Sequence, residues 1–342
     1  MALSEQNVLD VDGPGTAALT DPSRWPGPRR LRDLDGRGRL VALLLVLALS
    51  LPFAASIASA RDIDWTPTGD EALITLRVRE VFSSDPPLIG QPSTADHYSE
   101  VDPPHHPGPI QFYLLAPFVK VFGPDLGMLL GVGLINLLAV LTVPWVALRR
   151  AGPLVALGAA VVVATVAWSQ GLAVLTDNIS SNAGGIPLLA LAALAWGVVD
   201  RDLRLLPAAV LAFSFVAQQH LAILANALGM GLWGVAGMVV AIVAWSRERS
   251  AVADSADVMA EGAPVGDEAI DDLPLFVDVS QEIVAPASQP APASAATDRS
   301  PWPWVAAAAV VGFVAWLPVL IDQFFGQGNL SRMARFASSG ER

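Results

Sequence analysis

The sequence predicts an all-α membrane protein, a polytopic bundle of about seven transmembrane helices with an outer loop of juxtamembrane amphipathic helices. Hydrophobic residues make up 53% of the 342 residues and charged residues only 15%, which is too apolar for an ordinary soluble domain. Several runs reach the roughly 20 apolar residues that cross the hydrocarbon core of a bilayer. Runs of this length are helical spans, not strands of a closed barrel.

Taken in order, residues 1–39 are rich in Gly, Pro, Asp and Arg without an apolar period, which predicts a disordered cytoplasmic tail. The membrane domain, 40–246, begins with a span at Leu40 to Ala60. One apolar run, Leu205 to Trp245, is interrupted at Gln218-Gln219-His220 and predicts two crossings joined by a tight turn. The spans after the first are expected at 126–148, 152–170, 184–199, 204–221, 227–246 and 302–321.

Arginine placement predicts the orientation of these spans. Arginines precede span one and then fall at every second boundary, whereas the turns 171–183 and 217–226 contain no Lys or Arg. By the positive-inside rule the arginine side is cytoplasmic. We therefore expect a multi-pass protein of the inner (plasma) membrane with a cytoplasmic N-terminus and an extracytoplasmic loop 61–125. Residues 301–342 would be the last span and an extracytoplasmic C-terminus.

The acidic charge of the chain is concentrated in residues 247–300. This segment holds eleven acids against three arginines, a net charge of -8 out of -12 for the whole chain, and a Pro-Ala-Ser tract at 285–296. Such a composition predicts a disordered cytoplasmic linker. No basic patch with interleaved aromatic residues indicates a nucleic-acid partner. The absence of cysteine removes disulfides and thiolate metal sites.

Two short helices are expected in the outer loop. Thr68 and Glu71 have the spacing of a capping box, and the following stretch, 72–82, carries Ile74, Val78, Val81 and Phe82 in one apolar stripe at helical spacing. This pattern predicts an amphipathic helix on the outer leaflet. The aromatic and apolar stretch from Ile110 to Phe122 is too short to span, so we expect it to lie in the membrane interface.

Polar side chains gather on the predicted outer side, which suggests an outward-facing polar cavity. The alternative is that outer turns are simply polar. The four histidines all belong to this side, three of them in the loop and the fourth at the outer end of the fifth span. The residues concerned are His97, His105, His106, His220, Asp177, Asn178, Gln218, Gln219, Asp322 and Gln323.

Asp70 and the two loop histidines are the sharpest candidates for chemistry. The capping box does not need Asp70, so this carboxylate can accept a proton from an acceptor hydroxyl; the alternative is an acid that favours the helix dipole. Four prolines stiffen the segment around His105 and His106, which suits binding of a phosphate or a sugar; the alternative is a turn that re-enters the membrane. A metal site would require both histidines and Asp70 to converge, which their spacing does not indicate.

At these residues the sequence resembles the GT-C superfamily of polyprenyl-phosphate-sugar-dependent glycosyltransferases, which includes protein mannosyltransferases and lipid A aminoarabinose transferases. Gly69-Asp70-Glu71-Ala72 resembles the acidic pair of their long outer loop. His106-Pro107-Gly108-Pro109 through Tyr113, with Phe122-Gly123, is similar to their juxtamembrane segment. The His-Pro-Gly-Pro form, Gln219-His220 and Asp322-Gln323 resemble an actinobacterial branch. Members commonly run well beyond 342 residues, so we expect a partial or shortened member.

The resemblance implies inverting transfer of a sugar from a polyprenyl-phosphate donor to an acceptor hydroxyl of the cell envelope, at the outer face of the bilayer. Asp70 would be the general base, paired with Glu71. The departing phosphate needs hydrogen-bond donors, preferably cationic ones. No cofactor is implied with certainty, and dependence on a divalent metal stays open. The implied substrate-binding candidates are His105, His106, Arg77, Arg79, Gln219 and His220.

Two other functions stay open. A transporter or flippase of a lipid-linked or small solute is the first, although transporters usually carry ionisable or helix-breaking residues within their spans, and paired repeats. These spans hold almost none, and no internal repeat is evident. The second is a non-catalytic scaffold whose acidic linker, 247–300, recruits a partner.

Overall fold

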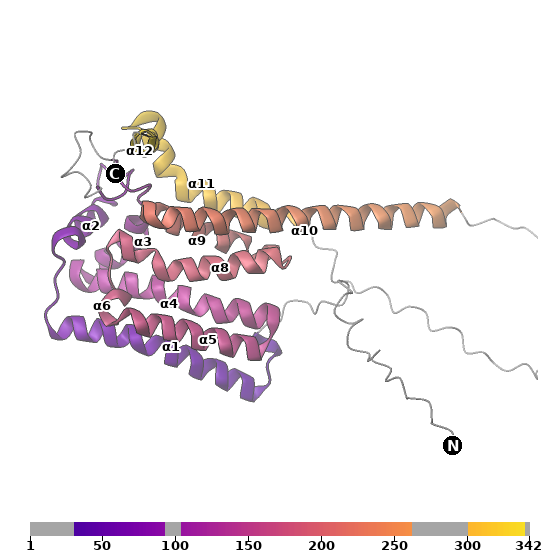
Figure 1. The fold of residues 1–342 in the computed structure, drawn as a ribbon, viewed down its shortest axis with the longest axis horizontal. Coiled ribbons are helices and arrows are strands. Elements are labelled where there is room, and N and C mark those ends of the chain that lie inside the picture. The colour runs from indigo at the N-terminus through magenta and orange to yellow at the C-terminus, as the bar shows by residue number, and fades with distance from the viewer. Residues whose placement is uncertain (1–30, 93–103, 262–299, 339–342) are drawn as a thin grey trace, which may run out of the picture.

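The structure, a computed structural model, describes residues 31–92, 104–261 and 300–338. Within these ranges the chain forms helices joined by turns, with no β-strand, and the long helices lie side by side in one bundle (Figure 1). Lipid offers no hydrogen-bond partners to the backbone, so a helix that satisfies its own peptide groups is the natural form of these apolar runs. The predicted all-α membrane class is confirmed.

Six helices are long and apolar enough to cross a membrane, counted over the described ranges. The fifth predicted crossing, expected at 204–221, corresponds to Leu203–Gln219, which is apolar but shorter and packs inside the bundle. The helices that correspond to the predicted spans are α1 (Gly36–Asp62), α4 (Pro124–Ala151), α5 (Pro153–Gln170), α8 (Gly185–Val199), α9 (Leu206–Gln219), α10 (Leu221–Glu261) and α11 (Trp302–Phe325).

Two helices organise the packing. The α4 helix contacts α1, α5 and α8, and α9 contacts α8, α10 and α11. Small residues permit close approach, as membrane helices require: a Cβ on Gly237 of α10 would lie 2.5 Å from the Cα of Val199 at the end of α8. The bundle is therefore built around α4 and α9.

The helices alternate in direction, so their connections gather at two ends. We call the end that holds residues 61–92, 104–123, 171–184, 219–221 and 326–338 the loop end, and the end that holds residues 31–39, 147–154, 199–205 and 300–303 the arginine end. The break predicted between the fifth and sixth spans is present, because α9 stops at Gln219 and His220 is extended before α10 begins. Which end faces the cytoplasm stays a prediction from charge placement.

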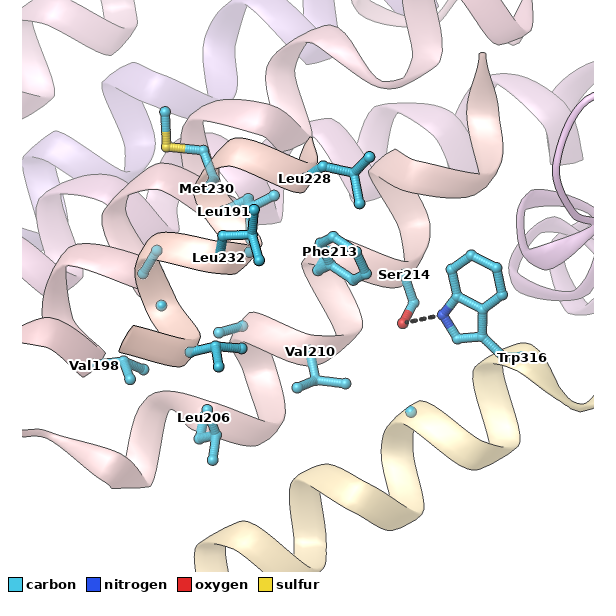
Figure 2. A pocket seen from close by; sticks show the side chains of 16 residues that line it. Leu191, Val198, Leu206, Val210, Phe213, Ser214, Leu228, Met230, Leu232 and Trp316 are labelled. Atoms are coloured by element: carbon cyan, nitrogen blue, oxygen red, sulfur yellow. Dashed lines mark hydrogen bonds between the residues drawn. The ribbon is translucent and has the colours of Figure 1, made fainter. Parts of the chain in front are cut away.

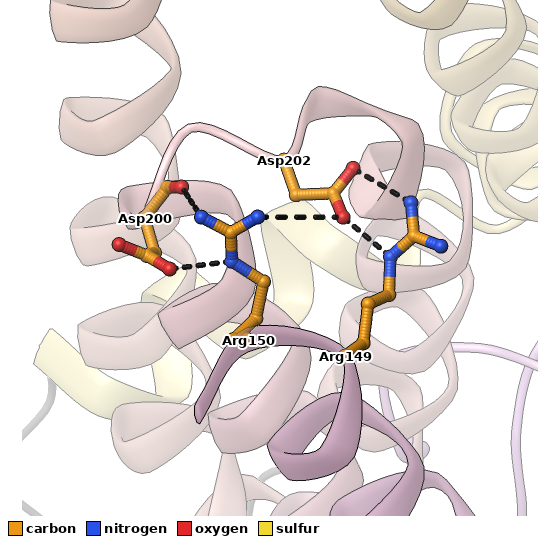
Figure 3. A network of polar contacts seen from close by, with 4 residues as sticks. All are labelled: Arg149, Arg150, Asp200 and Asp202. Atoms are coloured by element: carbon orange, nitrogen blue, oxygen red, sulfur yellow. Dashed lines mark hydrogen bonds and ion pairs between the residues drawn. The ribbon is translucent and has the colours of Figure 1, made fainter. Parts of the chain in front are cut away.

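An ion-pair network ties two turns together at the arginine end (Figure 3). Arg149 donates to both carboxylate oxygens of Asp202, and Arg150 donates to the carboxylate and the carbonyl oxygen of Asp200. The side chain of Asp202 is only 4% exposed. The network joins the α4–α5 turn to the α8–α9 turn, in which Arg201 has a positive φ of 64°.

Two boundaries differ from the sequence predictions. The first helix starts at Gly36, where the Asp35 carboxylate accepts from the Gly38 N–H at 2.7 Å, four residues before the expected start at Leu40. The α10 helix continues to Glu261, so 247–261 is helical where disorder was predicted; an established helix propagates cheaply once nucleated. Residues 1–30 and 262–299 of the predicted disordered segments lie outside the described ranges.

Candidate functional site

The loop end is covered by two short helices, α2 (Gly69–Glu80) and α3 (Ile110–Phe122). The predicted capping box is confirmed, with the Thr68 N–H donating to Glu71 Oε2 at 3.3 Å. Ile74 and Val78 pack in one buried cluster with residues of α3 and α4. The predicted apolar stripe is wrong at Phe82, which lies beyond the end of α2 and is 59% exposed.

A cavity of about 190 Å³ at the loop end holds two carboxylates, those of Glu71 and Asp177. It lies between the ends of α1, α2 and α4 and the short helix α6 (Leu172–Leu175). Asp70 is half-buried but is not one of its lining residues. Successive residues of a helix point about 100° apart, so the structure directs Glu71, and not its neighbour, into the cavity. The remaining lining residues are Ser56, Ser59, Ala60, Ile63, Trp65, Leu129, Leu172, Ala173 and Thr176.

The electrostatics of this cavity favour a basic carboxylate. Burial raises the pKa of Glu71, the hydrogen bond from Thr68 opposes this, and the charge of Asp177 raises it further. Asp177 is itself held in place, because it accepts from the Ile179 N–H at 2.8 Å and from the Asn182 amide at 2.7 Å. Glu71 is thus a carboxylate with raised proton affinity beside a fixed second negative charge.

Buried amide side chains connect this cavity to the other side of the loop end. Asn178 donates to the Glu71 carbonyl at 3.4 Å, and Gln111 of α3 donates to the Asn178 carbonyl at 2.7 Å. The residue before Gln111 in α3, Ile110, donates its N–H to Gln218 Oε1 at 3.2 Å. Gln218 also donates to the Ala315 carbonyl of α11 at 2.9 Å. Residues far apart in the sequence therefore form one polar layer.

At the far side of this layer the rings of His106 and His220 lie 4.7 Å apart at 42°. His220 Nδ1 accepts from the Ala222 N–H at 3.1 Å, so its Nε2 carries the proton and can donate. Burial, with the nearby His220 and His105, lowers the pKa of His106 to about 4. Burial also lowers the pKa of His220. Both rings are therefore neutral at pH 7, unlike the cationic donors that the resemblance implies.

The His105–Gly108 segment is locked by its neighbours. Asn329, at the start of α12 (Asn329–Ser338), accepts from the His105 N–H at 2.9 Å and donates to the carbonyls of both His105 and His106 at 3.2 Å. A Cβ on Gly108 would lie 2.2 Å from Gln218 Oε1. Only glycine fits at that close approach. Asp322 holds Asn329 in turn, accepting its N–H at 2.8 Å.

Three buried amide oxygens of the described residues have no hydrogen-bond partner, those of Gln91, Asn178 and Gln219. Their own residues are 5%, 1% and 2% exposed. Unpaired buried polar atoms are uncommon and call for a partner. All three are acceptors, so the missing partner is a hydrogen-bond donor, such as a water or a ligand hydroxyl.

The two arginines of α2 have different environments, as their spacing predicts. Arg77 pairs with Glu80 at 2.6 Å. Arg79 lines an open groove of about 410 Å³ between α2 and α3, together with Lys120 and the apolar side chains of Val78 and Val119. Lys120 lies over the Phe82 ring, 5.9 Å from its centre. Arg79 and Lys120 thus bring positive charge to this groove, at the end of α3 away from the neutral histidines.

The structure separates the predicted site residues into two groups. Glu71 and Asp177 share the cavity, and His106, His220 and Gln219 lie at the opposite side of the polar layer, with His105 beside them. His97 lies outside the described ranges. Within those ranges no three His, Cys, Asp or Glu side chains are grouped to hold a metal.

Sequence reasoning did not select Lys120 or Gln111. Lys120 is the single lysine of the chain, and Gln111 is the one polar residue in the first turn of α3, so both had a detectable signal. Comparisons of the chain with protein-family models, with curated proteins and with solved structures found no match.

Proposed function

We propose that the protein is an inverting glycosyltransferase of the plasma membrane, moving a sugar from a polyprenyl-phosphate donor to an acceptor hydroxyl at its loop end. The observation that carries the proposal is the cavity that brings Glu71 and Asp177 together at the loop end of the bundle. An apolar cavity of about 150 Å³ takes one six-membered ring, so about 190 Å³ is room for a single sugar. The donor brings its own lipid anchor, which suits a site at bilayer depth.

Glu71 is the general base of this proposal. As the acceptor oxygen attacks the anomeric carbon, its proton passes to the Glu71 carboxylate, and the bond from that carbon to the phosphate oxygen breaks with its electron pair leaving on the phosphate. Oε2 already accepts from Thr68, so Oε1 takes the proton. The raised pKa of Glu71 strengthens the base.

Arg79 and Lys120 are the proposed partners of the departing phosphate, because charged hydrogen bonds to a developing oxyanion are the strong ones. Three apolar side chains near these two cations are largely exposed, namely Phe82 (59%), Val121 (71%) and Phe122 (50%). Apolar side chains exposed next to a cationic groove fit a lipid phosphate that enters from the bilayer.

Glu71→Gln tests the base directly. Glutamine at this position still completes a capping box but cannot take a proton, so α2 should remain folded while transfer falls by about 10²–10⁴-fold. Thr68→Ala is the matched control, since it removes the cap and keeps the carboxylate. Transfer is measured in membranes with a polyprenyl-phosphate sugar. Unchanged transfer by Glu71→Gln, with loss by Asp70→Asn, would return the role to Asp70.

The groove is tested by a second pair of variants. Arg79→Gln and Lys120→Gln should each raise the apparent KM for donor by about 10–100-fold, the loss of one charged hydrogen bond. Arg77→Gln is the control, because Arg77 is engaged with Glu80 on another face of α2. Equal effects of all three substitutions would indicate a general charge effect and contradict a phosphate site in the groove.

A further inference from the structure

A second cavity, of about 350 Å³, lies within the bundle between α8, α9, α10 and α11 (Figure 2). Leu191, Phe213, Leu228 and Leu232 lie around it, and Trp316 of α11 borders it. All its walls belong to the apolar crossings and none to the loop-end layer described above. It is therefore a cavity at membrane depth, distinct from the site of the proposed reaction.

The cavity offers nothing to water. Its polar group is the Ser214 hydroxyl, which accepts from Trp316 Nε1 at 3.1 Å (Figure 2). Water enters a cavity where it finds several polar partners, whereas apolar cavities stay dry and take hydrocarbon. A molecule that suits this cavity is accordingly apolar.

The geometry of the helices opens the cavity toward the bilayer. Both α10 and α11 pack against α9. Of the residues that line the cavity, Leu232 and Val235 of α10 are 70% and 51% exposed. In a membrane these side chains face lipid, so acyl chains are the hydrocarbon available to the opening.

We propose that this cavity holds one acyl chain of a membrane phospholipid, which fills the space over α9 between α10 and α11. A cavity of about 150 Å³ takes the six carbons of benzene, so 350 Å³ accommodates roughly a dozen chain carbons on the same scale. The bound chain acts as a packing element of the bundle. This inference does not depend on the proposed glycosyl transfer.

The cavity spans much of the depth of the bundle and lies apart from the loop-end residues. Ser214 is four residues, about 6 Å of helix rise, from Gln218, and Trp316 follows the Ala315 carbonyl to which Gln218 donates. At its other edge the cavity is lined by Val198 and Leu206, next to the turn of residues 199–205 at the arginine end. The cationic groove of Arg79 and Lys120 lies at the C-terminal end of α3, so the phospholipid and the proposed donor occupy different places.

Retention of lipid by filled variants tests the proposal. Gly234 lines the cavity, and its Cβ would make only an ordinary 3.7 Å contact with Ala195, so Gly234→Phe fills the space from α10. Val210→Phe fills it from α9. Gly229→Phe is the control on α10, where a Cβ meets nothing within 4 Å and the cavity is not touched.

The full chain is reconstituted in nanodiscs of phosphatidylethanolamine and phosphatidylglycerol, and native mass spectrometry counts the lipids that survive release. We expect about one lipid on the wild type and on Gly229→Phe, and at least tenfold less on both filled variants. Equal retention by all four proteins, or none on the wild type, overturns the proposal. A retained polyprenyl phosphate, or a dimer that the filled variants dissociate, overturns it in favour of that occupant.

A measurement on the wild type covers the case in which a filled variant fails to fold. Phosphatidylglycerol with a photoactivatable diazirine in its acyl chain is crosslinked in the same nanodiscs, and the labelled residues are mapped. Label on the cavity wall at Leu191 and Phe213 supports the proposal. Label confined to exposed side chains that do not line the cavity, such as Phe313, overturns it, since ordinary boundary lipid reaches these alone.

Discussion

Neutralising Asp202 should destabilise the bundle far more than neutralising an exposed acid of similar pairing. In Asp202→Asn the guanidinium of Arg149 loses its charge partner in a site where the two side chains are 12% and 4% exposed. Figure 3 shows that Arg150 also reaches the Asp202 carboxylate, at 3.9 Å. The substitution therefore leaves positive charge buried without compensation.

The expected cost follows from this burial. Removing one partner of a buried ion pair costs about 3–5 kcal/mol, whereas an exposed pair contributes about 0.2–1 kcal/mol. Glu80→Gln is the matched control, because the Arg77–Glu80 pair is 36% and 41% exposed. Replacing both partners by Arg149→Met with Asp202→Leu removes the stranded charge, so the double variant should lose less than the sum of the two single losses, with a coupling energy of about 2 kcal/mol.

Denaturant unfolding in mixed micelles measures the free energy of unfolding of the wild type and of five variants, namely Asp202→Asn, Glu80→Gln, Arg149→Met, Asp202→Leu and the double variant. Variants are compared only where the slope of unfolding free energy against denaturant concentration equals that of the wild type, because the differences then report changes in stability. If Asp202→Asn cost no more than Glu80→Gln, or the double variant lost the full sum, the network would not be a buried electrostatic contact. The joining of the two turns would then rest on apolar packing alone.

Two further predictions concern the loop end. Burial lowers the pKa of His106 from 6.5 to about 4, so between these pH values the unfolded chain binds a proton that the folded chain does not. The free energy of unfolding should therefore fall by about 3 kcal/mol as pH drops from 6.5 to 4. Measured across this range, it should depend less steeply on pH in His106→Gln than in the wild type. Gly108→Ala should lower the free energy of unfolding by about 2–4 kcal/mol in the same assay, because the added Cβ displaces Gln218 and breaks two buried hydrogen bonds. Gly158→Ala is the control and should change the free energy of unfolding little, because a Cβ there meets nothing within 4 Å.

Local patterns predicted much of the fold. The expected helix from Ile110 to Phe122 has those bounds in the structure, and the break at Gln219–His220 falls where the polar residues interrupt the apolar run. The capping box that the spacing of Thr68 and Glu71 predicts is present at the start of α2. Each of these features depends on residues within one or two turns of each other, so the sequence carries the whole interaction.

The site was less accessible to such reasoning. Asp70 and Glu71 are adjacent, and a pattern of spacing could not decide which of them enters a cavity whose other walls come from α1, α4 and α6. The 4.7 Å approach of His106 and His220 joins residues more than a hundred positions apart. The neutrality of His106 depends on burial contributed by those distant segments.

The sequence by itself determined the class of the protein, the course of its crossings and the caps and breaks of its helices. The reason is that a helix in lipid satisfies its backbone hydrogen bonds internally, so run length and local spacing suffice. Only the tertiary structure decided which carboxylate faces the cavity, which cations share the groove and where the apolar cavity opens. These depend on the rotation of each helix about its axis, which is fixed by side chains of neighbouring helices packing together.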